Sequence, residues 1–502
     1  LLPSAAIFVV FCLLVWWKGG AARGYAVYLL LGALVGVGIR ETTDARLAKI
    51  QGSYAGQEAV LTAEVESIGR AYGAGRVSAV LRVETVDGEA VRFRVECVSL
   101  PRCEAGGRIR GRFALDLPDA TQRLNDYADG IALSAEYQSG MLRLGPGRSF
   151  RARTARLQAA LSRALRGGMA ENTGGVLAAM VVGDRSHLTS TLRSAYRGAG
   201  LAHVLVVSGM HVSILCGDIL STLLPYEWEQ SYRRRRRRAV FRSLLAFLLM
   251  GVTGFTPSVC RAAVAVWVGA LGVWLYGPPD TLTSLAVAGI VMTAGNSYAV
   301  CDIGFELSFA AVVGTVAGGV CIRRARDAWY RQFWKNAKNP VKRPWYFKLP
   351  ERLWGLAESI CISFCASVAT FPVLVLRGLS VSIYAVASSV AVLWLIQPMM
   401  LLGLGTAFAG LVPALAPLYG VLSAASAALT GLLDRWAVWI SAKPGAGIYF
   451  DTAYAAIVCL VLILLCWLAF HWRVRLRVAG PCILLAAAVS IGLGNALSRD
   501  VV

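Results

Sequence analysis

Long apolar runs dominate this chain, but residues 57–144 alternate apolar and polar positions instead. Two shorter apolar runs come before that stretch, at residues 1–17 and 25–39, with Lys18 and Arg23 between them. Positively charged loops of membrane proteins stay in the cytoplasm. The pattern therefore predicts an N-terminal transmembrane hairpin whose turn is cytoplasmic.

Alternation with a period of two residues is the mark of a half-buried β-strand. Five segments between residues 57 and 144 show it, and Asp87-Gly88 between the second and third is a strong hairpin signal. The segments are residues 59–66, 77–86, 90–97, 108–115 and 131–137. So many short strands in so short a stretch predict a small β-barrel domain of the OB-like kind, with a small sandwich as the alternative.

Residues 150–167 carry leucines at one helical spacing and arginines over most of the remaining surface. The arginines are Arg151, Arg153, Arg156, Arg163 and Arg166. A segment of this kind is too polar to span a bilayer and is typical of an amphipathic helix that lies on the membrane surface. On the external side, its charge serves either adsorption to anionic lipid or attraction of a polyanion.

From Gly200 onward the chain is mostly apolar and holds about ten candidate membrane spans. They are residues 200–224, 239–254, 259–276, 282–294, 303–322, 356–376, 381–396, 399–415, 453–470 and 481–497. Several are shorter than the roughly 20 residues that a spanning helix needs. Glycine and proline interrupt them, which favours broken or re-entrant helices around a cavity.

The predicted fold class is thus a polytopic α-helical membrane protein with an extracytoplasmic small β-barrel. Four regions are expected. They are the hairpin at 1–40, the barrel at 57–145, amphipathic and linking helices at 150–199, and a helical channel domain at 200–502.

Composition agrees with a membrane protein and excludes a soluble enzyme. The chain is 57% hydrophobic, its mean hydropathy is +0.59, and 50 Lys+Arg against 29 Asp+Glu give a net charge of +21. Such an excess indicates basic cytoplasmic loops first and nucleic-acid binding second.

The basic loops also predict an orientation. If the first hairpin turns inside, the six arginines at 233–238 and the loop 323–352 fall on the cytoplasmic side. The arginines at 473–477 join them if residues 418–440 are an interfacial segment and not a span. The barrel and the C-terminus are then expected outside the cytoplasm.

Groups that need hydrogen bonds interrupt the apolar run that follows Gly200. They are His203, Ser208, Gly209 and His211. Because burying such groups in hydrocarbon is costly, they should face a pore, a cavity or a partner helix. On one continuous helix the two histidines would differ by about 12 Å of rise and about 80° of rotation, so they do not form a chelating pair. Helix packing and a role in lining a site both remain open.

Charged residues stand at the start of two later apolar runs. Arg261 follows Pro257, while Asp302 and Glu306 are four residues apart and would share a helix face. An arginine in the bilayer costs roughly 3 kcal/mol on insertion scales. We therefore expect Arg261 to pair with Asp302 or Glu306 as a structural salt bridge, and lining of a conducting path is the alternative.

Two cysteines, Cys97 and Cys103, lie in the alternating region. Outside the cytoplasm a local disulfide between them is expected. The sequence has no paired CxxC or similar metal pattern and no Walker motif, so neither a metal nor another cofactor is expected.

In their order along the chain, six motifs resemble the ComEC family of competence proteins, the inner-membrane channels of DNA uptake. The motifs are Gly183-Asp184-Arg185, residues 200–211, Pro257-Ser-Val-Cys-Arg261, residues 302–309, Phe371-Pro372 and Pro398. The resemblance covers most of the chain. It implies that one strand of incoming DNA crosses the bacterial inner membrane to the cytoplasm during natural transformation.

A path for this polyanion needs hydrogen-bond donors for phosphate in a narrow, hydrated channel. The residues that we expect along the path are His203, Ser208, Gly209, His211, Arg261 and Ser308. Asp302 and Glu306 would repel phosphate, so we assign them to structural pairing.

The resemblance also implies partners. They are single-stranded DNA, membrane lipid, a ComEA-like external DNA receptor and a ComFA-like cytoplasmic ATPase. Many family members carry an external metallo-β-lactamase-like domain that degrades the other strand, but this sequence has no HxHxDH string. We therefore expect no enzymatic activity in this chain. Either the sequence stops short of that domain or a separate nuclease acts in its place.

The sequence departs from the family pattern at Glu306, where glutamine is more usual, and at Ser388-Ser389, where asparagine is expected. Two other function classes stay open. Broken spans with buried charges also suit a secondary transporter for a small anion or lipid. An intramembrane hydrolase would use Ser208 with His203 or His211, although no third group that orients the base is evident.

Overall fold

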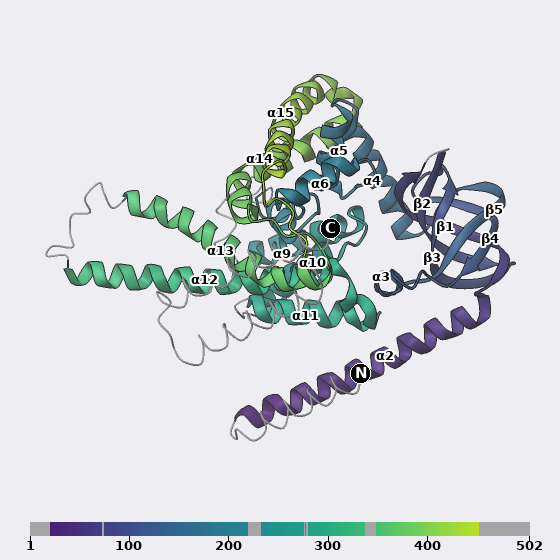
Figure 1. The fold of residues 1–502 in the computed structure, drawn as a ribbon, viewed down its shortest axis with the longest axis horizontal. Helices are drawn as coiled ribbons and strands as arrows, with labels where there is room; N and C mark the ends of the chain where they lie inside the picture. The colour runs from purple at the N-terminus through teal and green to yellow at the C-terminus, as the bar shows by residue number, and fades with distance from the viewer. Residues whose placement is uncertain are drawn as a thin grey trace, which may run out of the picture. The chain divides into compact units, whose positions relative to one another are not determined.

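The computed structural model describes residues 21–72, 75–218, 232–275, 277, 280–336 and 348–450. The chain forms two compact units (Figure 1). We call them the barrel unit, Leu1–Gly147 with Ala288–Asp302, and the helical unit, Arg148–Val287 with Ile303–Val502. The predicted spans at 1–17, 453–470 and 481–497 lie outside the described residues.

The barrel unit contains the five predicted strands, each at least as long as expected. They are β1 (Gln57–Tyr72), β2 (Arg76–Val86), β3 (Glu89–Pro101), β4 (Gly107–Asp116) and β5 (Ile131–Pro146). Their order around the sheet is β1-β2-β3-β5-β4, and antiparallel pairing of β4 with β1 closes it into a barrel. β3 and β5 run parallel, while the other neighbours are antiparallel. Closure removes the exposed sheet edges that a sandwich would leave.

The barrel core follows from the period-two pattern. Leu61, Leu81, Phe113 and Leu133 come from four different strands, and none of their surface is exposed. Most alternate residues of β2, β3 and β4 point outward, as the pleat requires, while β1 and β5 each have three consecutive buried residues. Asp87 turns the hairpin between β2 and β3 with a positive φ of 49°, as the dipeptide signal predicted.

Two further segments complete the barrel unit. α2 (Ala21–Tyr54) contains the predicted span 25–39 and continues through a polar stretch to the barrel. η4 (Ser297–Cys301) docks on it, since the Tyr298 hydroxyl donates to Asp44 Oδ1 at 2.7 Å. Asn296 Nδ2 donates to the Tyr127 carbonyl, at 2.6 Å, in α3 (Arg123–Ala128). The chain therefore returns to the barrel unit just before residue 303.

The helical unit consists of helices, most of them apolar. They are α4 (Phe150–Arg166), α5 (Glu171–Val182), α6 (Ser190–Gly198), α7 (Gly209–Ser213), the π-helix η2 (Ile214–Asp218), α9 (Tyr232–Val252), α10 (Pro257–Leu275), α11 (Thr281–Ala294, which crosses between the units), α12 (Ile303–Asn336), α13 (Lys348–Leu376), α14 (Ala385–Leu411), η6 (Pro413–Leu415) and α15 (Ala416–Ser441).

Five of the described helical segments are long and apolar enough to cross a membrane, so the chain is a multi-pass membrane protein. They are Pro257–Leu275, Ile303–Arg331, Leu353–Leu376, Ala385–Leu411 and Pro413–Ser441. α11, with 14 residues, is shorter than a span needs. α12 and α13 lie side by side as a long hairpin (Figure 1). The expected total of about ten spans stays a prediction.

Two predictions about the spans are wrong, and a third segment is a helix long enough for an alternative interpretation. Segments 381–396 and 399–415 were expected as two spans, but most of both lies in one helix, α14, with Pro398 inside it. The ring removes one backbone donor, and neighbouring helices can re-satisfy the freed carbonyl, so a proline need not end a membrane helix. Segment 418–440, whose interfacial position was a condition of the expected orientation, lies in α15, which is long and apolar enough to span. Segment 200–224 does not begin as a helix, because residues 201–208 are irregular.

The core of the helical unit is built around α5. Residues 174–182 of this helix are all buried, and the helix packs against α4, α14 and α15. A Cβ atom on Gly403 of α14 would lie 2.7 Å from Val181 Cγ2, so the two helices approach as closely as a glycine allows. A helix that is apolar all round needs such complete cover.

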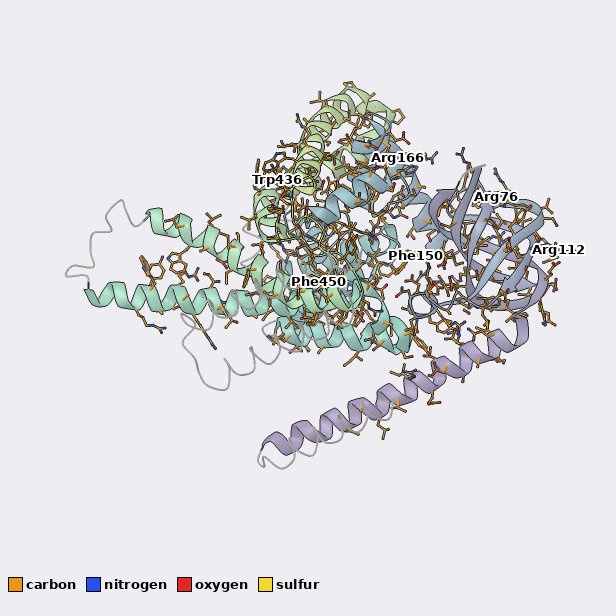
Figure 2. All side chains as sticks on the ribbon, in the orientation of Figure 1. Arg76, Arg112, Phe150, Arg166, Trp436 and Phe450 are labelled. Atoms are coloured by element: carbon orange, nitrogen blue, oxygen red, sulfur yellow. The ribbon has the colours of Figure 1, made fainter. Side chains whose placement is uncertain are left out.

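The sequence pattern of α4 predicted a helix that lies on a membrane surface, but in the structure α4 packs against other helices. Ala152, Ala155 and Leu165 are buried, and the helix packs against α5, α9 and α14. Phe150, which Figure 2 labels, lies at one end of α4. It stacks on Phe247 with ring centroids 5.1 Å apart. Because a basic amphipathic helix can turn its apolar face to protein as well as to lipid, the sequence pattern alone did not distinguish the two.

Candidate functional site

The irregular segment 201–208 begins at a glycine that the fold requires. Gly200 has a φ of +73°, and a Cβ atom there would lie 2.5 Å from Ala385 Cα at the start of α14. The left-handed conformation and the close backbone approach both exclude a side chain. Gly200 thus fixes where this segment leaves α6 and passes α14.

The segment ends at Ser208, where α7 starts. The backbone N–H of Ser208 donates to His211 Nδ1 at 3.0 Å, so the histidine ring caps the turn that carries it. His211 is fully buried, and its Nε2 has no hydrogen-bond partner among the described residues. His203 lies in the irregular segment and is exposed. The two histidines therefore have different hydrogen bonds: His203 bonds to the backbone of Gly200, and His211 accepts from the backbone of Ser208.

Arg261, in the second turn of α10, reaches both this segment and α12. Its Nε donates to Ser308 Oγ of α12 at 2.7 Å. A Cβ atom on Gly209 would lie 2.6 Å from its Nη2, so a larger residue there would displace the guanidinium. The structure thus brings Gly209, Arg261 and Ser308 together from three helices, and Ser208 is the residue that precedes Gly209. We call these four residues the arginine site.

The predicted salt bridge of Arg261 is wrong. Glu306 pairs with Arg377 after α13, with Nε and Oε2 3.0 Å apart. Asp302 lies outside α12 in extended backbone, so it does not share a helix face with Glu306. Among the described residues, Arg261 donates to the Ser308 hydroxyl and forms no salt bridge.

The spacing on α12 explains why the acid and the hydroxyl have different partners. Glu306 and Ser308 are two residues apart, about 200° around a helix, so they point in nearly opposite directions. One face of α12 presents a hydroxyl to Arg261, and the other presents a carboxylate to Arg377. Arg261 therefore keeps its positive charge without a carboxylate. Only its Nε is in a hydrogen bond among the described residues, and a guanidinium has five N–H donors.

Asp184, in the quoted Gly-Asp-Arg motif, holds two helices together. It accepts hydrogen bonds from Ser162 of α4 and from the hydroxyl of Ser186, the latter at 2.6 Å. Burial by itself raises the pKa of Asp184, but these hydrogen bonds outweigh burial and hold the pKa below its ordinary value. Gly183 closes α5 with a φ of 78° just before it. The motif is therefore a junction between α4 and α5.

Sequence reasoning missed two polar pairs in the helical unit. One is Arg377 with Glu306. The other is Tyr196 of α6, whose hydroxyl donates to Asp434 Oδ1 of α15 at 2.7 Å. Asp434 is the only acid of α15, and an acid in an apolar helix is a signal that could have been used. Tyr196 gave no such signal, because its neighbours are ordinary helix residues.

The basic helix α4, which was expected on the external side, is less uniform than its sequence indicates. Of the five arginines in α4, only Arg153 and Arg163 are exposed. Arg151 lies over the ring of Phe255, 4.3 Å from its centroid, and Arg166 Nη1 is 3.3 Å from His187 Nδ1. Three of the five, Arg156 included, are therefore half-buried, so the helix does not present one continuous basic face.

Cys97 and Cys103 are free cysteines in the structure, not the expected disulfide. Cys97 points into the barrel core from β3, and Cys103 packs against the same core from the turn before β4. Burial raises the pKa of both thiols to about 11, which favours the neutral form. Within the described residues, no cluster of His, Cys, Asp and Glu could hold a metal ion.

Comparison with known proteins agrees with the arrangement of these motifs. The chain is 30% identical over 136 residues to ComE operon protein 3 of Bacillus subtilis (strain 168). The aligned stretch covers 27% of this chain and 17% of that protein. No solved structure matches. The family described as Competence protein matches residues 180–475, which is more than half of the chain and includes the arginine site. The chain therefore belongs to the Competence protein family.

Proposed function

We propose that this chain conducts single-stranded DNA across the bacterial inner membrane into the cytoplasm during natural transformation. The observation that carries the proposal is the arginine site. There Arg261 meets Ser308 and the glycine start of α7, and no carboxylate pairs with its charge among the described residues. Membership of the competence family supports a role in DNA uptake.

The physical problem of such a channel is to pass a polyanion through a medium of low dielectric constant. A guanidinium presents planar donors that match phosphate oxygens, and each contact with a charged group is stronger than one between neutral groups. A carboxylate partner would hold the arginine too tightly to exchange between successive phosphates. A hydroxyl partner orients the arginine and leaves its charge available, which is what a transient phosphate contact needs.

The orientation we propose puts the barrel unit outside the cytoplasm. Residues 288–302 belong to that unit and run directly into α12, whose later part begins the basic segment 323–352 that the sequence predicted as a loop. Merging 381–396 with 399–415 removes one span and α15 adds one, so the number of crossings between residues 352 and 473 is unchanged. The basic segments at 323–352 and 473–477 then share one side, which the positive-inside rule makes the cytoplasmic side.

In this proposal the barrel is an OB-like domain that receives DNA outside, from a ComEA-like receptor. A ComFA-like ATPase would pull the strand from the cytoplasm, and a separate nuclease would degrade its complement. The chain itself acts as a channel and not as an enzyme. Five strands closed through the first and fourth, with a parallel third and fifth pair, support the OB-like assignment.

The test is DNA uptake by cells whose only copy of the protein is wild type or Arg261→Gln. Labelled duplex DNA is offered, and single strands in the cytoplasm are counted at equal protein level. We expect at least a tenfold loss of entry with surface binding unchanged. Arg261→Lys should be intermediate, because an ammonium keeps the charge but loses the planar fork.

The matched control is Arg377→Gln with Glu306→Gln, which removes the neighbouring arginine together with its own acid. It should leave entry within about twofold, since a neutral pair replaces an ion pair whose net contribution is small. Entry by Arg261→Gln equal to that of wild type would refute the proposed phosphate contact. Equal losses in both variants would show that any polar change in this region blocks entry, which also contradicts the special role of Arg261.

A further inference from the structure

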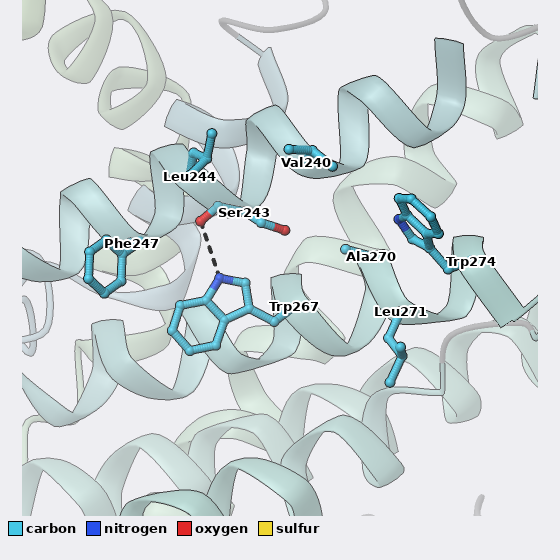
Figure 3. Close-up of a pocket in the computed structure, with 8 residues that line it drawn as sticks. All are labelled: Val240, Ser243, Leu244, Phe247, Trp267, Ala270, Leu271 and Trp274. Atoms are coloured by element: carbon cyan, nitrogen blue, oxygen red, sulfur yellow. Dashed lines mark hydrogen bonds between the residues drawn. The ribbon is translucent and has the colours of Figure 1, made fainter. Parts of the chain in front are cut away.

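A groove with apolar walls runs between α9 and α10, away from the arginine site. Its volume is about 560 Å³. The lining residues are Val240, Ser243, Leu244, Phe247, Trp267, Ala270, Leu271 and Trp274. Trp267 Nε1 donates to the Ser243 carbonyl at 3.2 Å, which satisfies the indole and leaves its ring on the wall (Figure 3). Leu244 is 63% exposed and Leu271 55% exposed, so the walls are apolar surface without a protein cover among the described residues.

One end of the groove carries a basic side chain that aromatic rings hold in place. The guanidinium of Arg236 lies 4.2 Å from the ring centroid of Tyr232 and 4.3 Å from that of Trp274. The Tyr232 hydroxyl donates to the carbonyl of Val273 at 3.2 Å, which ties the start of α9 to the end of α10. Arg236 is thus fixed over Trp274, and its Nε is buried with no hydrogen-bond partner among the described residues.

The charge at this end calls for an anion. Six arginines, residues 233–238, occupy the first two turns of α9, and the first turn contains no acid. Cations at a helix N-terminus oppose the helix dipole, and like charges three or four residues apart repel each other. An anion bound at Arg236 would offset part of this positive charge.

The length of the groove fits one leaflet of a bilayer. From Arg236 to Phe247 is eleven residues along α9, or about 16 Å. Half of a hydrocarbon core of about 30 Å is about 15 Å. A phosphate held at Arg236 would therefore place an acyl chain along the walls as far as Phe247. A polynucleotide would find donors at the basic end but none along the apolar walls.

We propose that this groove binds an anionic phospholipid, with its phosphate at Arg236 and one acyl chain between α9 and α10; the exposed Arg233, Arg235 and Arg237 lie beside Arg236 in the sequence. The proposal is independent of the DNA-conducting function, because it uses none of the residues of the arginine site.

The experiment measures retained lipid. The full chain is purified in a neutral detergent, incubated with phosphatidylglycerol or phosphatidylcholine of the same chain length, and examined by native mass spectrometry. Wild type should retain phosphatidylglycerol at least fivefold more than phosphatidylcholine. Arg236→Gln with Trp274→Ala should remove that preference. Leu244→Gln should weaken retention while leaving the arginines intact.

The matched control is Lys443→Gln with Trp439→Ala, because Lys443 lies 4.7 Å from the Trp439 ring centroid without such a groove. This control should retain phosphatidylglycerol as wild type does, and thermal melts should show every variant folded. Equal retention of both lipids by wild type would overturn the proposal, as would unchanged retention in the groove variants. Displacement of phosphatidylglycerol by a short single-stranded oligonucleotide, with no effect of Leu244→Gln, would assign the arginines to nucleic acid instead.

Discussion

Gly200→Ala tests whether the irregular segment before α7 is held by close backbone contact. The new Cβ would lie 2.5 Å from Ala385 Cα and 2.6 Å from Ala385 Cβ, where carbon atoms normally rest about 3.5–4.0 Å apart. The two backbones must therefore separate by about 1 Å. The left-handed φ of +73° adds about 1–2 kcal/mol for any residue with a Cβ. Overpacking at such a site costs about 1–3 kcal/mol.

Together these costs predict a destabilisation of about 2–5 kcal/mol, which for a unit of this size lowers the melting temperature by roughly 3–7 °C. The assay is thermal unfolding of the purified chain in detergent, followed by uptake of labelled DNA. Uptake should fall more than stability alone explains, because the segment carries Ser208 toward Arg261. Gly420→Ala is the control, since nothing lies within 4 Å of the Cβ position in α15 and alanine is the better helix former. A melting temperature within about 2 °C of wild type for Gly200→Ala would refute the reasoning.

Three further predictions concern single contacts. Tyr196→Phe should destabilise the helical unit by about 1.5–3 kcal/mol, because it removes the hydroxyl that donates to the Asp434 carboxylate. A double-mutant cycle with Asp434→Asn measures the coupling energy, and strictly additive effects would contradict this prediction. Cys97 should react with iodoacetamide at pH 8 only after unfolding, since burial raises its pKa to about 11; if neither Cys97 nor Cys103 reacted after unfolding without reductant, a disulfide would be present after all. Burial, followed by repulsion from nearby acids, raises the pKa of Asp126 to about 6 from an ordinary value of 3.8. The folded protein therefore binds this proton more tightly than the unfolded chain, and stability should rise as pH falls from about 6 toward 4; Asp126→Asn should reduce that dependence in thermal melts, and an unchanged dependence would count against it.

The strands could be predicted from the sequence because alternation, turn residues and length agree with one another. Asp87-Gly88 is a local signal, and the barrel core needs no long-range information beyond which face is apolar. The helices of the helical unit are harder. An apolar run does not show whether a proline within it ends the helix. Pro398 lies inside one continuous helix, α14.

The site residues illustrate the same limit. Ser208, Gly209, Arg261 and Ser308 were chosen from polar types in apolar runs, and the structure brings them together. Their partners could not be chosen that way. Whether Arg261 meets Glu306 or Ser308 depends on how α12 is rotated, and a difference of two residues reverses the answer. Arg377 follows the end of an apolar run, where a cation is ordinary, so nothing marked it as the partner of Glu306.

The buried helix α5 has a consequence for how the protein is made. Its 12 residues are apolar enough for lipid, yet they measure only about 18 Å, too short for the insertion machinery to treat as a span. During synthesis α5 leaves the ribosome long before α14 and α15, which later cover it. Until those helices are synthesised, its apolar surface is exposed and must be covered by another protein or by lipid. Substitutions in α14 or α15 should therefore show first as degradation of newly made chains, and only afterwards as altered behaviour of finished ones.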